Sequence, residues 1–291
     1  MTAPQQSIPG PALVVLRSLA ALRPQVASWR LRGETLGLVP TMGALHAGHM
    51  ALIEAARQVC DRVAVTIFVN PLQFNKPADL ACYPRREAED IAKLEAAGVD
   101  LLYAPLAADI YPEGFCTSVS VAGLTDCLCG AARPGHMTAV ATVVAKLLLQ
   151  ALPNAAYFGE KDYQQLLVVQ RMAKDLDMPL SVVAVPTLRD ADGLALYSRN
   201  ANLSPTQRAL APQLYRRLDD LAEELSDGRP AAAPLAAARA DLLDAGFTAV
   251  DYVELRAEGS LATLEAAEVP ARVFAAVCLG EVRLIDNVKL L

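Results

Sequence analysis

The chain has 291 residues, of which 54% are hydrophobic and 20% are charged, and its formal net charge is -6. This balance is typical of a globular protein and excludes a disordered chain, and the negative charge argues against a broad nucleic-acid-binding face. At about 150 residues per domain, the length favours two domains.

The most apolar run raises the question of a membrane segment, because the mean hydropathy is +0.29. That run, residues 139–152, is interrupted by Lys146 and Gln150 and is shorter than the ~20 apolar residues of a spanning helix. We therefore expect a buried helix and no membrane partner. Residues 1–11 lack the charged and apolar regions of a secretory signal, so we expect a mobile leader and a cytoplasmic protein.

The cysteines do not indicate a disulfide framework or a metal site. There are six, none of them in a Cys-x-x-Cys pair, in a chain too large to need disulfide bridges. We expect most of them to be small buried hydrophobic residues. Cys127 and Cys129 precede His136, but this spacing is unusual for a metal site and a fourth ligand is not evident.

Short β-branched segments alternate with longer amphipathic segments up to about residue 187. The pattern predicts strands at 35–39, 63–69, 99–103, 155–158 and 180–185, and helices at 50–59, 87–97, 139–152 and 163–177. Such alternation indicates βαβ units in a parallel sheet. We expect a Rossmann-like, doubly wound α/β domain over residues 1–187.

The remaining residues, 188–291, predict a smaller α+β domain. Ser204 can cap a helix, Pro205 suits its first turn and Gln207 can return a hydrogen bond, so we expect one long helix to about residue 226. An alanine-rich helix follows the break at 228–230. Strands are expected near 252–256, 273–278 and 283–286, with a hairpin turn at 279–281.

The segment 36–49 predicts a phosphate site. A strand runs into a glycine-bearing turn and a helix start that contains His46, Gly48 and His49. The first N–H groups of a helix and its positive dipole end bind anions. Two imidazoles three residues apart can donate N–H groups to charge developing on a phosphate. A lone histidine here would suggest a cap or a core residue, but the pair around Gly48 favours function.

Three further turns carry polar residues at the expected carboxyl edge of the sheet. Gln73 follows the strand that ends at residue 69, and its neutral amide suits a substrate carboxylate or a loop anchor equally. His136 follows Arg133 in a rigid turn before a helix, where a capping role is equally possible. Lys161 follows the strand at 155–158 and can neutralise a phosphate, although taken alone it reads as part of a helix cap.

Several runs of the sequence together resemble one enzyme family. They are residues 39–46, 67–74, 83–85, 133–136, 158–165, 192–200 and 283–287. In this order, over nearly the whole chain, they are similar to the pantoate-β-alanine ligases, also called pantothenate synthetases. The His-x-Gly-His element alone marks only a wider nucleotidyl-transfer superfamily, which includes class I aminoacyl-tRNA synthetases.

This resemblance implies an ATP-dependent condensation of pantoate with β-alanine to give pantothenate, AMP and pyrophosphate, through a pantoyl adenylate, with Mg²⁺ and in a homodimer. It implies a catalytic role for His46, His49, Lys161, Ser198 and Arg199, nucleotide binding by Met42, Gly43, Gly48, Gly159 and Asp162, substrate binding by Gln73, Gln165, Arg133 and His136, and a metal neighbour in Asp90. The residues 188–291 would then form a lid domain.

Four positions depart from the family pattern, which has Glu at Cys129, Phe at Met137, Gly at Ala139 and Ser at Tyr197. The first three affect the expected substrate fit and dimer more than the reaction type. A tyrosine hydroxyl lies farther from the backbone than a serine hydroxyl, so the Tyr197 ring either swings outward and leaves the phosphates to Ser198, Arg199 and Lys161, or lies over the nucleotide and replaces a polar contact with packing. We expect the first, because crowding the site would cost more than one lost hydrogen bond.

Two other function classes share these residues. A nucleotidylyltransferase would use the same histidine element and form no amide, and a nucleotide-binding protein could keep the fold without turnover. Pyrophosphate release from ATP and pantoate, measured with and without β-alanine, separates the three classes.

Overall fold

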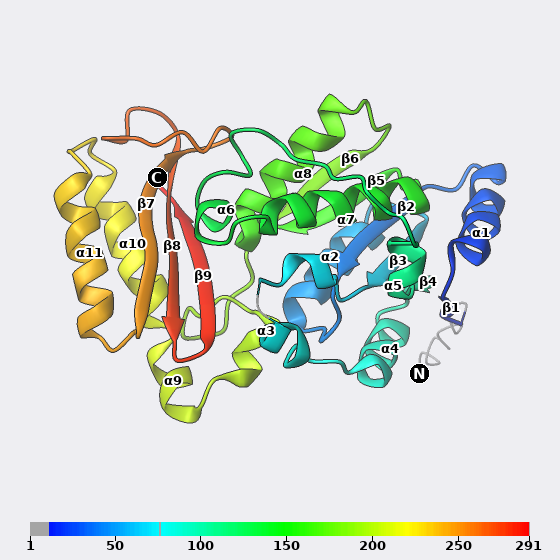
Figure 1. The fold of residues 1–291 in the computed structure, drawn as a ribbon, viewed down its shortest axis with the longest axis horizontal. Coiled ribbons are helices and arrows are strands. Elements are labelled where there is room, and N and C mark those ends of the chain that lie inside the picture. The colour runs from blue at the N-terminus through cyan, green and yellow to red at the C-terminus, as the bar shows by residue number, and fades with distance from the viewer. Residues whose placement is uncertain (1–11, 76, 291) are drawn as a thin grey trace, which may run out of the picture.

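The structure, a computed structural model, describes residues 12–75 and 77–290. The predicted leader, residues 1–11, lies outside the described residues. Over the described residues the chain forms a parallel sheet and a smaller antiparallel sheet (Figure 1). Tyr252 and Phe274 of the smaller sheet belong to the same hydrophobic core as helix α7 (His136–Ala151), so the two parts pack against each other.

The parallel sheet has the strand order β1-β4-β3-β2-β5-β6. Its strands are β1 (Val14–Leu16), β2 (Leu36–Thr41), β3 (Arg62–Ile67), β4 (Leu101–Tyr103), β5 (Ala155–Gly159) and β6 (Ser181–Val185). After β2 the chain builds β3 and β4 on one side, and it later places β5 and β6 on the other. The switch point therefore lies between β2 and β5, where open α/β sheets bind ligands at the carboxyl ends of the strands.

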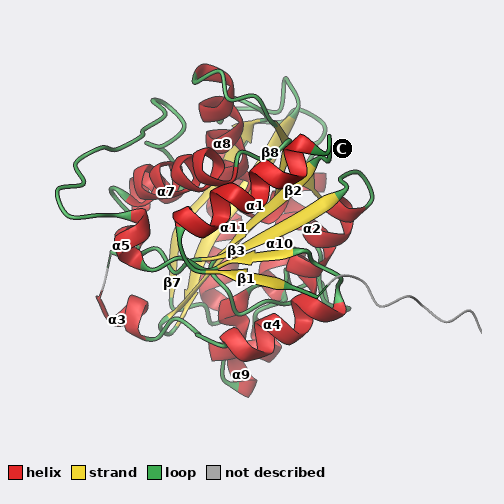
Figure 2. Cartoon of the chain, turned by 90° about the vertical axis from the view of Figure 1, so that its right-hand side faces the viewer, coloured by secondary structure: helices red, strands yellow, loops and turns green. Residues whose placement is uncertain are grey.

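Helices cover both faces of this sheet (Figure 2), which confirms the doubly wound α/β prediction. One face packs against α1 (Leu19–Leu31), α7 and α8 (Tyr163–Asp175), and the other against α2 (Ala47–Arg57) and α4 (Glu87–Ala96). Successive strand residues face opposite sides, so Leu38 enters the first core and Val39 the second. The apolar run at 139–152 is the buried helix α7, as expected.

Short helical segments lie in the connections. They are η1 (Pro71–Gln73), α3 (Pro77–Ala81), α5 (Ala107–Ile110), α6 (Cys129–Ala132), η2 (Glu160–Asp162) and η3 (Ser198–Asn202). Within residues 12–75 and 77–290, no helix combines the length and apolarity needed to cross a membrane.

The C-terminal part has the antiparallel strand order β7-β8-β9, with α10 and α11 beside the sheet (Figure 1). Its elements are α9 (Pro205–Leu210), α10 (Gln213–Leu225), α11 (Ala232–Asp244), β7 (Ala249–Ala257), β8 (Ala271–Leu279) and β9 (Val282–Lys289). The predicted hairpin is confirmed, because Leu279 pairs with Val282 across a turn in which Gly280 has a φ of +58°.

The prediction of one long helix over 204–226 is wrong. Its start is as expected, because Ser204 Oγ accepts the Gln207 N–H at 3.3 Å and Gln207 Oε1 accepts the Ser204 N–H at 2.9 Å. However, α9 ends at Leu210 and α10 begins only after Pro212. Proline has no N–H for the helical ladder, so it separates the two helices.

The expectation that most cysteines are buried is also wrong. Cys129 is buried, Cys60, Cys127 and Cys278 are partly buried, and Cys82 and Cys116 are exposed. The exposed pair lies in connections outside the long helices and strands.

Candidate active site

A buried carboxylate shapes the loop that follows β2. Asp90 on α4 is 1% exposed, and its two oxygens accept the N–H groups of Ala44 and Leu45, both at 2.8 Å. Gly43 has a φ of +81°, and a Cβ there would lie 3.1 Å from Asp90 Oδ2. Glycine is therefore required at 43 by both backbone conformation and space.

The two histidines of the next turn hold the start of α2. His46 is the N-cap residue, and its Nδ1 accepts the N–H of Gly48 at 3.2 Å. His49 Nδ1 accepts the His46 N–H at 3.3 Å, and the ring centroids are 4.1 Å apart. A Cβ on Gly48 would come within 2.9 Å of the His46 ring, so glycine leaves room for it. Because each Nδ1 accepts a hydrogen bond, each neutral ring carries its proton on Nε2.

Both rings are neutral at physiological pH. Burial, followed by the charge of Lys161, lowers the pKa of His46 to about 4. Burial, followed by His46, lowers the pKa of His49 to about 3. The sequence predicted N–H donors here, and the geometry assigns the donor of each ring to Nε2.

Lys161 lies just after β5, and its ammonium group is buried. Nζ has no hydrogen-bond partner among residues 12–75 and 77–290, lies 3.6 Å from Asp162 Oδ1 and stands 4.0 Å from the centroid of the Tyr197 ring. The backbone of this loop is held from the other sheet, because Asn287 Nδ2 donates to the carbonyl oxygens of Glu160 at 2.9 Å and Lys161 at 3.1 Å. A buried ammonium group with open donors suits an incoming anion.

The segment η3 brings Ser198 and Arg199 to the same region. Ser198 Oγ donates to the Ala44 carbonyl at 3.1 Å, which joins η3 to the histidine loop. Arg199 donates a hydrogen bond to the Tyr197 hydroxyl, and the Lys161 ammonium group makes a cation–π contact with the ring of the same tyrosine. The expectation that Tyr197 swings outward is therefore wrong: attraction to two cations holds the ring between them.

A buried asparagine positions Gln73. Asn70 is 1% exposed, accepts the Tyr111 hydroxyl at 2.9 Å and donates to Gln73 Oε1 at 3.1 Å. Gln73 Nε2 lies 3.0 Å from Met42 Sδ. The amide orientation is thus set by Asn70, which leaves the Gln73 NH₂ group facing Met42.

Arg133 and His136 support the backbone of the same residue. Arg133 Nη2 donates to the Gln73 carbonyl at 3.0 Å, and His136 Nδ1 lies 2.8 Å from that oxygen. Arg133 Nη1 is 3.2 Å from His136 Nε2, and Arg133 Nε donates to Asn75 Oδ1 at 3.3 Å. Burial, followed by the charge of Arg133, lowers the pKa of His136 to about 4. Most hydrogen-bonding groups of Arg133 and His136 therefore already have partners within the protein.

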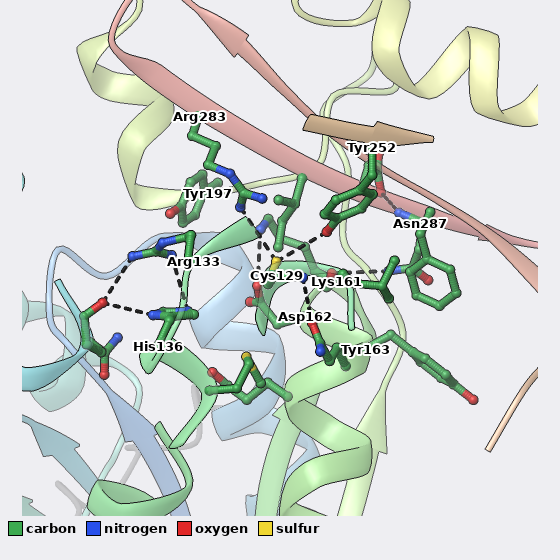
Figure 3. A pocket seen from close by; sticks show the side chains of 18 of the residues that line it. Cys129, Arg133, His136, Lys161, Asp162, Tyr163, Tyr197, Tyr252, Arg283 and Asn287 are labelled. Atoms are coloured by element: carbon green, nitrogen blue, oxygen red, sulfur yellow. Dashed lines mark hydrogen bonds and ion pairs between the residues drawn. The ribbon is translucent and has the colours of Figure 1, made fainter. Parts of the chain in front are cut away.

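Two adjoining cavities collect the predicted residues. The histidine cavity includes His46, Gly48, His49, Gly159 and Ser198, and has an apolar wall with Phe68, Val140, Val143 and Val144. The arginine cavity, drawn in Figure 3, includes Arg133, His136, Arg199, Cys129, Tyr252 and Arg283. Both are lined by Met42, Gln73, Lys161, Asp162, Gln165 and Tyr197. Of the predicted site residues, Gly43 and Asp90 line neither.

The predicted metal role of Asp90 does not fit its surroundings. Both carboxylate oxygens accept backbone N–H groups, and the side chain is buried under the loop that it shapes. Among residues 12–75 and 77–290 there is also no group of three or more His, Cys, Asp or Glu side chains placed to hold a metal. The protein groups seen here thus do not form a magnesium site around Asp90.

Sequence reasoning assigned no role to three residues that shape the site. Asn70 orients Gln73, Asn287 holds the Lys161 backbone, and Arg283 lines the arginine cavity. The last two lie in the 283–287 run that carried part of the family resemblance, and that run was the available signal.

Comparison with known proteins places these features in a family. The sequence profile of the family described as Pantoate-beta-alanine ligase matches residues 14–289. A pantothenate synthetase from Roseobacter denitrificans is 58% identical over 274 residues, which cover 94% of this chain and 96% of the relative. One from Paramagnetospirillum magneticum is 54% identical over 277 residues, covering 95% and 98%.

Solved structures of the same family are also similar to this chain. A pantothenate synthetase from Thermus thermophilus is 46% identical, with a TM-score of 0.89 and coverage of 95% of this chain and 99% of the other. A pantoate-beta-alanine ligase from Francisella tularensis, in complex with beta-gamma ATP and beta-alanine, is 34% identical, with a TM-score of 0.81 and coverage of 96% and 98%.

Proposed function

This chain belongs to the pantoate-beta-alanine ligase family, and from that premise we propose that it condenses pantoate with β-alanine, using ATP, to give pantothenate, AMP and pyrophosphate. The observation that carries the proposal is a convergence at the switch point of the parallel sheet. There the start of α2, with two neutral imidazoles, shares a cavity with the buried ammonium group of Lys161. This combination suits charge transfer onto phosphate oxygens.

In the first step, a carboxylate oxygen of pantoate attacks the α-phosphorus of ATP and pyrophosphate leaves. A carboxylate is a poor electrophile, and its conversion to a pantoyl adenylate gives it AMP as a leaving group. His46 and His49 would donate through Nε2 to the phosphate oxygens, and Lys161, Ser198 and Arg199 would bind the triphosphate. Met42, Gly48, Gly159 and Asp162 would border the nucleotide.

Pantoate would bind in the histidine cavity, at its border with the arginine cavity, where the same residues line both. The amides of Gln73 and Gln165 would bind its hydroxyl and carboxylate oxygens, and the apolar wall from α7, with Val140 and Val143, would pack against its dimethyl carbon. A neutral amide binds the carboxylate without holding its charge, which has to pass to the phosphate.

In the second step, the neutral amine of β-alanine attacks the carbonyl carbon of the adenylate, the C–O bond to AMP breaks, and the amine loses a proton. The protein contributes chiefly by positioning the two reactants and shielding the adenylate from water. We propose that Arg133 and His136 act here by holding the Gln73 backbone in place.

We also propose that Mg²⁺ accompanies ATP, bound mainly by phosphate oxygens and water, as this ion prefers. We do not propose Asp90 as a ligand of Mg²⁺, and we assign no reaction step to the ion. We propose further that residues 1–187 and 188–291 act as two domains and that the chain works as a homodimer in the cytoplasm. Light scattering that shows a fully active 30.9 kDa monomer contradicts the dimer.

Isotope transfer tests the reaction. When pantoate carries ¹⁸O in its carboxylate, one labelled oxygen should appear in AMP, because the carboxylate oxygen bonds to the α-phosphorus and stays there when the amide forms. Mass spectrometry of AMP and pantothenate measures this. Label retained entirely in pantothenate, or release of ADP and orthophosphate, rules out the adenylate route.

A further inference from the structure

The peptide group that joins residues 44 and 45 is held by side chains from two other elements. Ser198 Oγ donates to the Ala44 carbonyl at 3.1 Å, and Asp90 Oδ1 accepts the Leu45 N–H at 2.8 Å. The other carboxylate oxygen, Oδ2, accepts the Ala44 N–H at 2.8 Å. Each polar atom of this peptide group therefore has a side-chain partner, and the group cannot rotate without breaking a hydrogen bond.

The next peptide group, which joins residues 45 and 46, is held in the same way. Lys93 Nζ donates to the Leu45 carbonyl at 2.7 Å, and His49 Nδ1 accepts the His46 N–H at 3.3 Å. Lys93 and Asp90 lie three positions apart on α4, which puts them on the same face of that helix. This face thus binds three backbone atoms of the loop before the two histidines.

These bonds hold Ala44 in a conformation that alanine disfavours. Its φ is +51°, in the left-handed region, where a Cβ crowds the following carbonyl oxygen. Such strain persists only where the surrounding contacts enforce it, and it concentrates at functional sites. Helix α4 is a rigid support, because Leu94, next to Lys93, is 0% exposed in the core. Ala44 lies two positions before His46, so its conformation sets the direction in which the chain enters α2.

Neither Asp90 nor Lys93 is placed to touch a reactant. Neither side chain lines the histidine cavity or the arginine cavity. Both oxygens of Asp90 are bonded to the backbone, and Lys93 adds a positive charge to the same face of α4, which disfavours a bound cation there. Their hydrogen bonds reach the site only through the loop.

We propose that Asp90 and Lys93 are positioning residues for adenylation, because together they hold the strained loop that places His46 and His49 in the histidine cavity. The histidines act on the phosphate, and the α4 pair acts on the backbone that carries them. This inference rests on the proposed function, since adenylation is the step that the histidines serve. Its structural part, the placement of the imidazoles, can be measured without turnover.

The variant Asp90→Asn tests the carboxylate. Asparagine offers one oxygen to two N–H groups and turns an NH₂ group toward the second, so the loop should shift. Pantoate-dependent exchange of labelled pyrophosphate into ATP measures adenylation, and its kcat should fall about 10- to 100-fold. The KM for pantoate should stay unchanged, because its proposed ligands, Gln73 and Gln165, lie outside the loop. Glu89→Gln, the same chemical change at an exposed position of α4, is the control and should match the wild type.

The variant Lys93→Met tests the ammonium group. It removes one of the three hydrogen bonds from α4, so kcat should fall by less than in Asp90→Asn, and Lys93→Arg, which keeps a donor, should restore it. Lys93 is exposed, so Lys93→Met keeps its fold even where the buried change at Asp90 does not. Lys174→Met, at an exposed position of α8, is the matched control.

A second change, Ala44→Gly, separates positioning from a general loss of stability. Glycine adopts a left-handed conformation without steric cost, so Ala44→Gly keeps the loop in place with fewer bonds. Combined with Asp90→Asn, it should recover most of the lost kcat. Ala44→Gly alone should exchange pyrophosphate at the wild-type rate.

Nuclear magnetic resonance of ¹⁵N-labelled histidine measures the arrangement directly. The chain has only three histidines, so their signals can be assigned. In the wild type His46 and His49 should each be a single tautomer protonated on Nε2, because each Nδ1 accepts a backbone N–H. In Asp90→Asn the shifted loop should weaken these bonds and give a mixture of tautomers.

The proposal is overturned if Asp90→Asn or Lys93→Met keeps the wild-type kcat, if Ala44→Gly recovers none of the rate lost in Asp90→Asn, or if the histidine signals do not change. A higher Mg²⁺ concentration for half-maximal exchange in Asp90→Asn also overturns it, since that result makes Asp90 a metal ligand. Absence of exchange in the wild type refutes the proposed function, while the histidine signals still decide whether α4 positions the loop.

Discussion

The side-chain amide of Asn287, on β9, donates a hydrogen bond of 3.1 Å to the backbone carbonyl of Lys161, just after β5. The same amide donates to Glu160, and its oxygen accepts Arg272 Nη1 at 2.7 Å. A residue of the antiparallel sheet thus fixes the backbone position of Lys161 at the carboxyl edge of the parallel sheet.

Replacing Asn287 by Ala should loosen the Lys161 loop. Two partly buried carbonyl groups lose their donor, so the free energy of unfolding should fall by about 1–3 kcal/mol. A displacement of Lys161 should also slow pantoate-dependent pyrophosphate exchange by about 10- to 100-fold. Denaturant unfolding and the exchange assay measure the two effects, with Asn202→Ala, at an exposed position, as the control. Normal exchange in a destabilised variant shows that Asn287 serves stability alone.

Replacing His46 or His49 by Ala should slow adenylation by about 10²- to 10³-fold, because one donor to the developing phosphate charge is lost. Pantoate affinity should change much less. His46→Asn separates catalysis from capping, since asparagine can accept the Gly48 N–H that His46 now accepts. If His46→Asn restores the rate that His46→Ala loses, the histidine acts as a cap and not as a phosphate donor.

The histidines should make the protein less stable in mild acid. The pKa values are lowered from 6.5 to about 4 for His46, about 3 for His49 and about 4 for His136. Between these values and 6.5 the unfolded chain binds more protons, so the free energy of unfolding rises with pH and falls as the pH drops from 6.5 toward 4. Each histidine contributes up to about 1.4 kcal/mol per pH unit.

Urea unfolding at pH 7, 6 and 5 measures that slope. The variant His49→Gln should show a shallower pH dependence than the wild type, because one buried imidazole no longer has to stay neutral. An identical slope in the two proteins contradicts the assignment.

Replacing Tyr197 by Ser should tighten ATP binding. In the present arrangement Lys161 lies over the Tyr197 ring and Arg199 bonds its hydroxyl, so both cations have to leave a partner when they bind phosphates. A cation–π contact is worth about 0.5–2 kcal/mol, so a gain of several-fold in affinity is expected. Tyr197→Phe keeps the ring and should fall between the two. Calorimetric titration with a non-hydrolysable ATP analogue measures this, and weaker binding by Tyr197→Ser makes the ring a working part of the nucleotide site.

The alternation of strands and helices was sufficient to predict the parallel sheet, since each element repeats its own hydrophobic period. The first elements were not predicted. β1 has only three residues, and α1 contains Pro24 inside the helix, so neither shows a regular pattern. The break at Pro212 was missed because the strong cap at Ser204 was followed by a continuous amphipathic pattern.

The site residues in turns between a strand and a helix could be predicted because their position in the chain determines their place at the edge of the sheet. Side chains whose role depends on a distant partner could not. Asp90 was expected beside a metal and instead shapes a loop 45 residues away. Tyr197 was expected outside and instead lies between two cations, because the orientation of its ring depends on Lys161.

The bond from Ser198 Oγ to the carbonyl of Ala44 joins residues 154 positions apart. Contacts of such separation are slow to form, because the entropy of closing the intervening loop opposes them. Strand pairing inside the antiparallel sheet and the helical turns involve much shorter separations, whereas β2 and β5 of the parallel sheet pair residues 118 positions apart. During refolding from denaturant, the far-ultraviolet circular dichroism signal should therefore recover before the protein regains the ability to bind ATP.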